Sequence, residues 1–146
     1  MIMVYNGLKS DLNCFAKFSY IYETEIKKLV KESEFSNKYK DAFQHSWKKL
    51  KKQIKYTKVN ELENAVIANN NKTYSLYYTK HKVLILDFCR HLRNSFSHAL
   101  VSRKQGRLFI NDKKGVKNTC LGFVNYSDAK QFIIEIINEY ELRAND

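Results

Sequence analysis

The sequence predicts an all-α fold, a helical bundle with a small β-hairpin inserted before the last helix. The chain has 146 residues, of which 44% are hydrophobic. That is enough to bury a core without disulfides or metal ions, so we expect a single domain spanning residues 1–146. It has no proline and only four glycines, and so few obligatory breaks favour long helices over a sheet with many turns. Apolar side chains also recur every three or four residues along most of the chain, as on the buried face of a helix.

The first two helices are predicted over residues 10–31 and 39–54. Ser10 or Asp11 is placed to cap the first, whose apolar residues are Leu12, Phe15, Phe18, Tyr22, Ile26 and Leu29. The second repeats this spacing with Tyr39, Phe43, Trp47, Leu50 and Ile54. Its other flank carries Lys48, Lys49, Lys51, Lys52 and Lys55. This lysine face is either a solvated helix surface or a contact for an RNA backbone.

The middle of the chain predicts a short helix, a loop and a long helix. The short helix covers residues 59–68, and Asn69-Asn70-Asn71 marks a polar loop after it. The long helix begins near residues 73–75. Its apolar residues are Tyr77, Tyr78, Leu84, Ile85, Phe88, Leu92 and Phe96. We expect it to contribute most of the core.

After Leu100 the pattern becomes that of a β-hairpin and a final helix. Residues 107–111 and 116–123 predict the two strands, with Asp112-Lys113-Lys114-Gly115 as the turn. Ser127 can cap the final helix, which opens near Tyr126. Its apolar stripe is Phe132, Ile133, Ile136, Ile137 and Tyr140.

The charge of the chain indicates an anionic partner. Twenty-six Lys and Arg against fifteen Asp and Glu give a formal charge of +11, and ten Tyr with nine Phe add aromatic surface. Nucleic acid fits this composition better than a membrane, and the alternative is a basic surface that serves only solubility. No apolar run approaches the roughly 18 residues of a spanning helix, and residues 1–5 lack the features of a signal peptide. We therefore expect a cytoplasmic protein.

The three cysteines predict neither a disulfide framework nor a zinc site. Cys14, Cys89 and Cys120 are odd in number and widely spaced, which is typical of reduced, buried thiols. Cys89 stands beside Arg90 and could be an activated nucleophile, but its position on the apolar side of the predicted helix favours packing.

The segment Arg93-Asn94-Ser95-Phe96-Ser97-His98 carries the clearest chemistry. On a helix, one face gathers Arg90, Arg93, Asn94, Ser97 and His98, and the opposite face gathers Ile85, Phe88, Cys89, Leu92, Phe96, Ala99 and Leu100. Arg93 has a permanent planar charge suited to phosphate, and His98 can take or give a proton near neutral pH. Such a pair suits RNA cleavage, in which a base deprotonates the 2′-hydroxyl and a cation stabilises the phosphorane. The product is a 2′,3′-cyclic phosphate, and DNA is spared.

One chain alone gives an incomplete site. Five residues separate Arg93 from His98, which places them about 140° apart around the helix axis and about 7.5 Å apart along it. Cleavage benefits from an acid as well as a base, and a two-fold homodimer would bring two copies of both residues into one cleft. Asn94 and Ser97 are supporting residues that can orient the imidazole or bind phosphate oxygens.

The remaining candidates are RNA-binding or structural. We expect RNA contacts from Arg90, Lys48, Lys52 and Lys55. Asp87 is the nearby acid and no carboxylates are grouped around the motif, so neither a metal nor any other cofactor is expected. The other histidines, by default, are surface or satisfied core residues; they are His45, His81 and His91.

The pattern from Arg93 to His98, followed by alanine, resembles the Arg-x4–6-His signature of the HEPN superfamily. The resemblance implies a HEPN-like bundle in which Arg93 and His98 are the catalytic pair and Asn94 is the polar residue that often follows the arginine. It also implies a composite active site in a homodimer and a metal-independent endoribonuclease, with a toxin, RNA-processing or phage-defence role. HEPN toxins neutralised by a nucleotidyltransferase antitoxin have a tyrosine where this chain has Leu100, so regulation by AMP transfer is not expected.

Two other hypotheses stay open. The chain could be a non-catalytic RNA- or nucleotide-binding module that uses the polar face around Arg93 together with the lysine face. It could also be an interaction or antitoxin-like protein whose apolar helix face and tyrosine-rich surface engage a regulatory partner.

Overall fold

The computed structural model describes residues 7–68, 74–77 and 82–145, without the side chains of Val59, Ala68 and residues 74–77. The predicted loop Asn69-Asn70-Asn71 and the residues Tyr78 and His81 lie outside this part of the chain.

Helices and strands alternate over much of the described chain. The α-helices are α1 (Leu12–Thr24), α2 (Glu32–Lys38), α3 (Lys40–Gln44), α4 (Ser46–Leu50), α5 (Leu62–Ala68), α6 (Leu84–Ser97) and α7 (Tyr126–Ala144). Short 3-10 turns are η1 (Lys9–Asp11), η2 (Ile26–Lys28), η3 (Lys51–Gln53) and η4 (Val59–Glu61). The strands are β1 (Ile54–Thr57), β2 (Tyr74–Tyr77), β3 (Val101–Lys104), β4 (Arg107–Lys114) and β5 (Lys117–Asn125).

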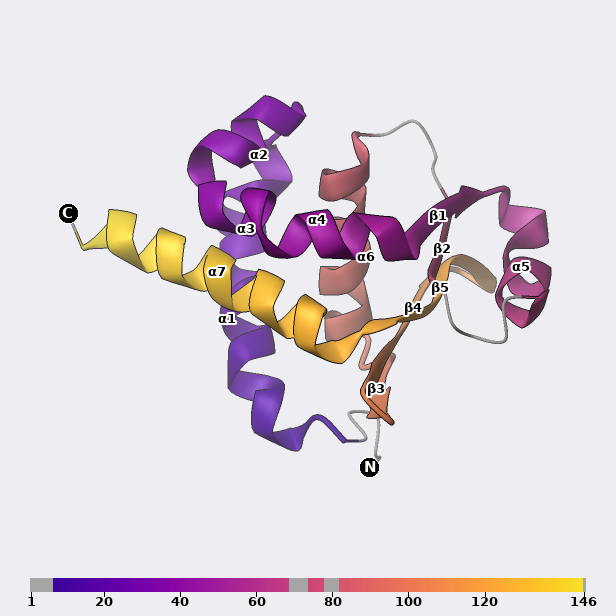
Figure 1. Ribbon diagram of the computed structural model, residues 1–146. Helices are drawn as coiled ribbons and strands as arrows, with labels where there is room; N and C mark the ends of the chain where they lie inside the picture. The colour runs from indigo at the N-terminus through magenta and orange to yellow at the C-terminus, as the bar shows by residue number, and fades with distance from the viewer. Residues whose placement is uncertain (1–6, 69–73, 78–81, 146) are drawn as a thin grey trace.

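The prediction of an all-α fold is wrong, because the strands form a five-stranded sheet in the order β1-β2-β5-β4-β3. β3, β4, β5 and β2 are antiparallel neighbours, and β1 joins β2 in parallel at one edge. The fold is therefore mixed α/β, with the helices on and around a sheet rather than in a bundle alone (Figure 1).

Three strands were not predicted: β3, and the strands β1 and β2, which overlap segments predicted as helix. β1 takes Ile54, the last apolar residue of the predicted second helix, and β2 takes the beginning of the predicted long helix. Both are four residues long and rich in aromatic or β-branched residues, which favour strands but form too short a run to fix a period. Pairing with distant segments makes these residues strands: Ile54 lies opposite Tyr74, and Tyr74 lies opposite Gly122.

Helix boundaries also differ from the predictions. α1 and the turns beside it replace one helix over 10–31, and three short helices and η3 replace the helix over 39–54. The long motif helix begins at Leu84 rather than near 73–75. Asn125, not Ser127, caps α7, because its side chain accepts the backbone N–H of Asp128 at 2.9 Å. The short helix over 59–68 is confirmed as η4 and α5.

The β-hairpin is confirmed as β4 and β5, and β3 extends it at the outer edge. Its turn is shorter than predicted: Lys114 pairs with Lys117, leaving Gly115 and Val116 as a two-residue loop. Gly115 has φ +66°, the conformation that the first central residue of a type II′ turn requires. Asp112 therefore belongs to β4 and not to the turn.

α6 is the central helix (Figure 1). It lies beside α1, where the rings of Phe15 and Phe96 stack with 3.9 Å between centroids. Trp47 of α4 packs against Phe88 of α6 and Phe132 of α7, at 5.7 and 5.9 Å between ring centroids. α6 also packs against β4. These contacts belong to one hydrophobic cluster that runs from Leu8 to Ile137.

α5 packs against β2 and β5 at the edge of this arrangement, and its buried Leu62 and Val66 stand outside the main cluster. No helix within the described ranges is both long enough and apolar enough to cross a bilayer.

The C-terminal end of α6 is fixed by its backbone. His98 is the last residue that continues the helical bonding, Ala99 follows with φ +55°, and Leu100 N–H bonds Ser95 C=O at 2.8 Å. Ala99 N–H bonds Phe96 C=O at 3.1 Å. This is a Schellman motif, which usually carries glycine at the left-handed position.

Ala99→Gly should therefore stabilise the protein. The left-handed conformation costs alanine roughly 1–2 kcal/mol, and the greater freedom of glycine in the unfolded chain removes about 0.4–1 kcal/mol of the gain. We expect the free energy of unfolding in a urea titration to rise by on the order of 0.5–1 kcal/mol. Ala16→Gly, at an exposed right-handed position in α1, should lower it by a similar amount. Equal destabilisation by both changes would contradict this account of the helix end.

Candidate functional site

α6 divides into the apolar and polar faces that the sequence predicts. Its segment contains neither glycine nor proline, and apolar residues recur at helical spacing. The predicted apolar residues Ile85, Phe88, Cys89, Leu92 and Phe96 are buried, and so are Leu86 and the polar residues Asp87, His91 and Ser95. Arg93 and Asn94 are half-buried, and Ser97 and His98 are exposed. Arg93, Ser97 and His98 are thus accessible to a ligand. Apolar residues hold the helix against α1, α4 and α7, and polar residues contact β4.

The Arg93 guanidinium is held at two points. Its Nη1 donates to Oδ1 of Asn94 at 3.1 Å, and its Nη2 lies 2.7 Å from Oε1 of Glu23 on α1. The other carboxylate oxygen of Glu23 lies 3.3 Å from Nζ of Lys27. The Arg93 and Glu23 side chains are 29% and 40% exposed, so this ion pair contributes about 0–1 kcal/mol to stability. A phosphate that approaches Arg93 would compete with Glu23 for the same N–H group.

Asn94 connects Arg93 to a buried polar group beneath α6. Its Nδ2 donates to Oδ2 of Asp112 at 3.2 Å, and the same oxygen lies 2.8 Å from Nδ1 of His91. Asp112 and His91 are 3% and 0% exposed. Because a carboxylate accepts hydrogen bonds, Nδ1 of His91 carries the proton. The result is a continuous chain of contacts from His91 through Asp112 and Asn94 to Arg93.

His98 stands apart from this chain of contacts. It is the exposed C-cap residue of α6, and no contact joins its side chain to Arg93 in the described part of the molecule. Ser97 lines a hollow of about 280 Å³ between α1 and the end of α6, together with Leu12, Phe15, Ala16, Ser19 and Phe96. One chain therefore presents Arg93, Asn94, Ser97 and His98 on the same helix without closing them into one pocket.

The residues predicted to bind RNA occupy two places. Nη2 of Arg90 lies 3.7 Å from Oδ1 of the buried Asp87, one turn earlier on the same helix. Lys48, Lys52 and Lys55 are exposed on α4, η3 and β1. Trp47 turns the inner side of α4 toward Phe88, ten residues or about 15 Å along α6 before His98. The three lysines are thus carried by elements away from the C-terminal end of α6.

Two buried groups near Arg93 are unsuited to proton transfer at neutral pH. Burial raises the pKa of the Cys89 thiol well above its ordinary value, so this residue packs and is not an activated nucleophile. Burial also raises the pKa of the Tyr22 phenol to about 12, so Tyr22 stays protonated. His98 is left as the exposed titratable group of the motif.

Glu23, His91 and Asp112 are the neighbours of the motif that the sequence did not single out. Glu23 looks like one of several charges on the wet side of α1, and its pairing with Arg93 depends on how the two helices pack. Asp112 left a usable signal: continuing the alternation of Leu108 and Ile110 along one strand places it on the buried side. A buried carboxylate requires a partner, and His91 is that partner.

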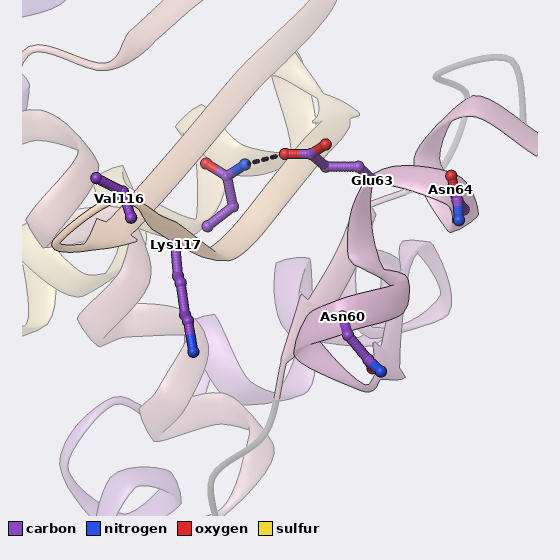
Figure 2. A pocket seen from close by; sticks show the side chains of 6 residues that line it. Asn60, Glu63, Asn64, Val116 and Lys117 are labelled. Atoms are coloured by element: carbon purple, nitrogen blue, oxygen red, sulfur yellow. Dashed lines mark hydrogen bonds between the residues drawn. The ribbon is translucent and has the colours of Figure 1, made fainter.

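A second hollow lies between α5 with η4 and the β4–β5 turn (Figure 2). It measures about 390 Å³ and is lined by Asn60, Glu63, Asn64, Val116, Lys117 and Asn118. Figure 2 shows Asn60 and Lys117 pointing in the same direction, while Asn118 donates to Oε1 of Glu63 at 2.7 Å. No α6 residue lines it, so it is distinct from the motif. The described residues contain no group of three or more His, Cys, Asp or Glu side chains arranged to hold a metal ion.

Comparison with known proteins adds no assignment: no family model, no curated protein and no solved structure matches the chain. The resemblance to the HEPN superfamily therefore rests on the motif from Arg93 to His98.

Proposed function

We propose that the chain is a metal-independent endoribonuclease of the HEPN type, whose active site is completed in a homodimer by Arg93 and His98 from two chains. The proposal rests on the exposure and the contacts of these two side chains. His98 is exposed at a helix end whose backbone is fixed, and Arg93 is partly exposed and held by Asn94 and Glu23. A fixed cation and a free imidazole are the groups that cleavage by the 2′-hydroxyl needs.

In the proposed reaction, His98 of one chain takes the proton of the 2′-hydroxyl as the oxygen attacks the neighbouring phosphorus. The bond from phosphorus to the 5′-oxygen breaks, and a second imidazole, His98 of the other chain, gives that oxygen a proton. Arg93 stabilises the charge on the non-bridging oxygens in the transition state. Asn94 holds Arg93, and Ser97, on the same face of α6, has the supporting role of binding phosphate oxygens. The products are a 2′,3′-cyclic phosphate and a free 5′-hydroxyl.

We place the second chain on the exposed surface of α1, which borders the end of α6. Leu12 is 39% exposed there and lines the hollow beside Ser97. Tyr20, further along α1 and next to Tyr140 of α7, is 60% exposed. Exposed apolar side chains next to an incomplete site favour burial by a second copy. A toxin or phage-defence role in the cytoplasm, with an antitoxin or other regulatory partner, is part of the same proposal.

The test is incubation of the purified protein with labelled RNA, and with DNA of the same sequence, in excess chelator. We expect the RNA to be cut and the DNA to stay intact, because DNA lacks the 2′-hydroxyl nucleophile. Intact RNA under these conditions, or cleavage of both nucleic acids, would contradict the proposal.

A non-catalytic RNA-binding module is the second candidate, and the exposed lysines of α4, η3 and β1 favour it. In the same assay this candidate gives RNA that is retained but not cut. Its affinity would fall steeply with salt, because each phosphate neutralised by Lys48, Lys52 or Lys55 releases counterions.

A further inference from the structure

The Asn94 side chain contacts a hydrogen-bond donor, Arg93, and an acceptor, Asp112, and only one orientation of its amide satisfies both. A side-chain amide has one accepting end, the oxygen, and one donating end, the nitrogen. Oδ2 of Asp112 lies 3.2 Å from Nδ2 of Asn94, and Nη1 of Arg93 lies 3.1 Å from Oδ1. Because a carboxylate accepts and a guanidinium only donates, both neighbours favour the same orientation of Asn94, with its oxygen toward Arg93 and its nitrogen toward Asp112.

Asp112 is itself firmly placed. It lies on the buried side of β4, where the pairing register with β5 shifts after it. Its side chain is bonded by the fully buried His91, and its backbone C=O accepts from Oγ1 of Thr119 at 3.1 Å. The other partner of Arg93, Glu23, is 40% exposed and shared with Lys27. The contact through Asn94 is therefore the more constrained of the two that hold the guanidinium.

We infer that Asp112 is a positioning residue that fixes the Arg93 guanidinium through the amide of Asn94. This inference rests on the proposed function, since it assigns Asp112 a part in the cleavage attributed to Arg93. An amide at position 112 would weaken the constraint, because its donating end can face Asn94 as well as its accepting end. A flipped Asn94 would then present N–H to N–H of Arg93, and the guanidinium would lose that partner.

The test compares Asp112→Asn with Ser95→Ala as a matched control. Ser95 Oγ lies within hydrogen-bond distance of His91 C=O at 2.8 Å and of Asn111 C=O at 3.0 Å, so it joins the same helix and strand without touching Arg93. Both variants alter a buried polar contact between α6 and β4. Only Asp112→Asn changes a group that contacts Asn94.

The first readout is the side-chain nitrogen NMR spectrum of Arg93, assigned by the signal that disappears in Arg93→Lys. In the wild type and in Ser95→Ala we expect separate Nη signals from a restrained guanidinium, and in Asp112→Asn a single averaged signal. The second readout is the single-turnover rate of RNA cleavage at saturating RNA. It should fall on the order of 100-fold in Asp112→Asn and change little in Ser95→Ala, and adding Asn94→Ala to Asp112→Asn should cause no further loss.

Unchanged Arg93 signals in Asp112→Asn would overturn the inference, whether or not RNA is cut. Loss of restraint in that variant, together with a wild type that cuts no RNA, would support the positioning role and defeat the proposed function. Should Asp112→Asn not fold, Asn94→Ala keeps the buried bond between His91 and Asp112. Arg93 signals that remain separate in Asn94→Ala would overturn the inference equally.

Discussion

His98→Ala should abolish RNA cleavage in chelator while leaving the fold intact. General acid and base catalysis by one positioned side chain contributes about 10²–10⁴-fold to a rate, and here the same residue is proposed to fill both roles. The imidazole is exposed and the helix end is fixed by backbone bonds to Ser95 and Phe96. The stability cost should therefore be that of an ordinary surface substitution, about 0.5 kcal/mol or less.

His45→Ala is the matched control, because His45 is also an exposed histidine and lies outside the motif, 3.5 Å from Glu135. We expect it to cleave RNA at the wild-type rate. Added imidazole should restore part of the activity of His98→Ala. It should not change the activity of His45→Ala. Full activity in His98→Ala would remove this residue from the mechanism.

Mixtures of wild type and His98→Ala should lose activity faster than simple dilution predicts. If cleavage needs His98 from both chains of a dimer, activity follows the square of the wild-type fraction. An equal mixture then retains about a quarter of the wild-type activity at constant total protein, rather than about half. The reason is that a mixed dimer has one imidazole and cannot supply the acid and the base together.

This measurement requires subunit exchange, which mass spectrometry of the intact mixed dimers can confirm. A mixture of wild type and His45→Ala should keep full activity throughout. A linear dependence on the wild-type fraction, with mixed dimers present, would show that each chain acts alone and would contradict the shared site.

The sequence correctly predicted features that depend on residues close together in the chain, namely the apolar residues of α6 and the β4–β5 hairpin. The spacing of Ile85, Phe88 and Leu92 identified the buried side of α6 correctly, since one helix face must meet the core wherever the helix packs. The same reasoning found the hairpin, because β4 and β5 are adjacent in sequence and joined by a turn that contains Gly115.

Contacts between distant segments could not be predicted from such patterns. β1 and β2 are each four residues long and depend on each other and on β5, so neither carries a sufficient signal of its own. For the candidate site, the motif residues on α6 could be predicted from their chemistry. The strand alternation could have indicated that Asp112 is buried. Its contact with Asn94, like that of Glu23 with Arg93, depends on how β4 and α1 pack against α6.

The chemical ends of the RNA fragments test the central claim most directly. The account predicts 2′,3′-cyclic phosphate and 5′-hydroxyl ends when the protein cuts RNA in excess chelator. A single 2′-deoxy substitution at the cut site should stop cleavage there, because it removes the attacking oxygen. Fragments with 3′-hydroxyl and 5′-phosphate ends, or undiminished cutting at the deoxy position, would contradict attack by the 2′-hydroxyl and with it the roles given to Arg93 and His98.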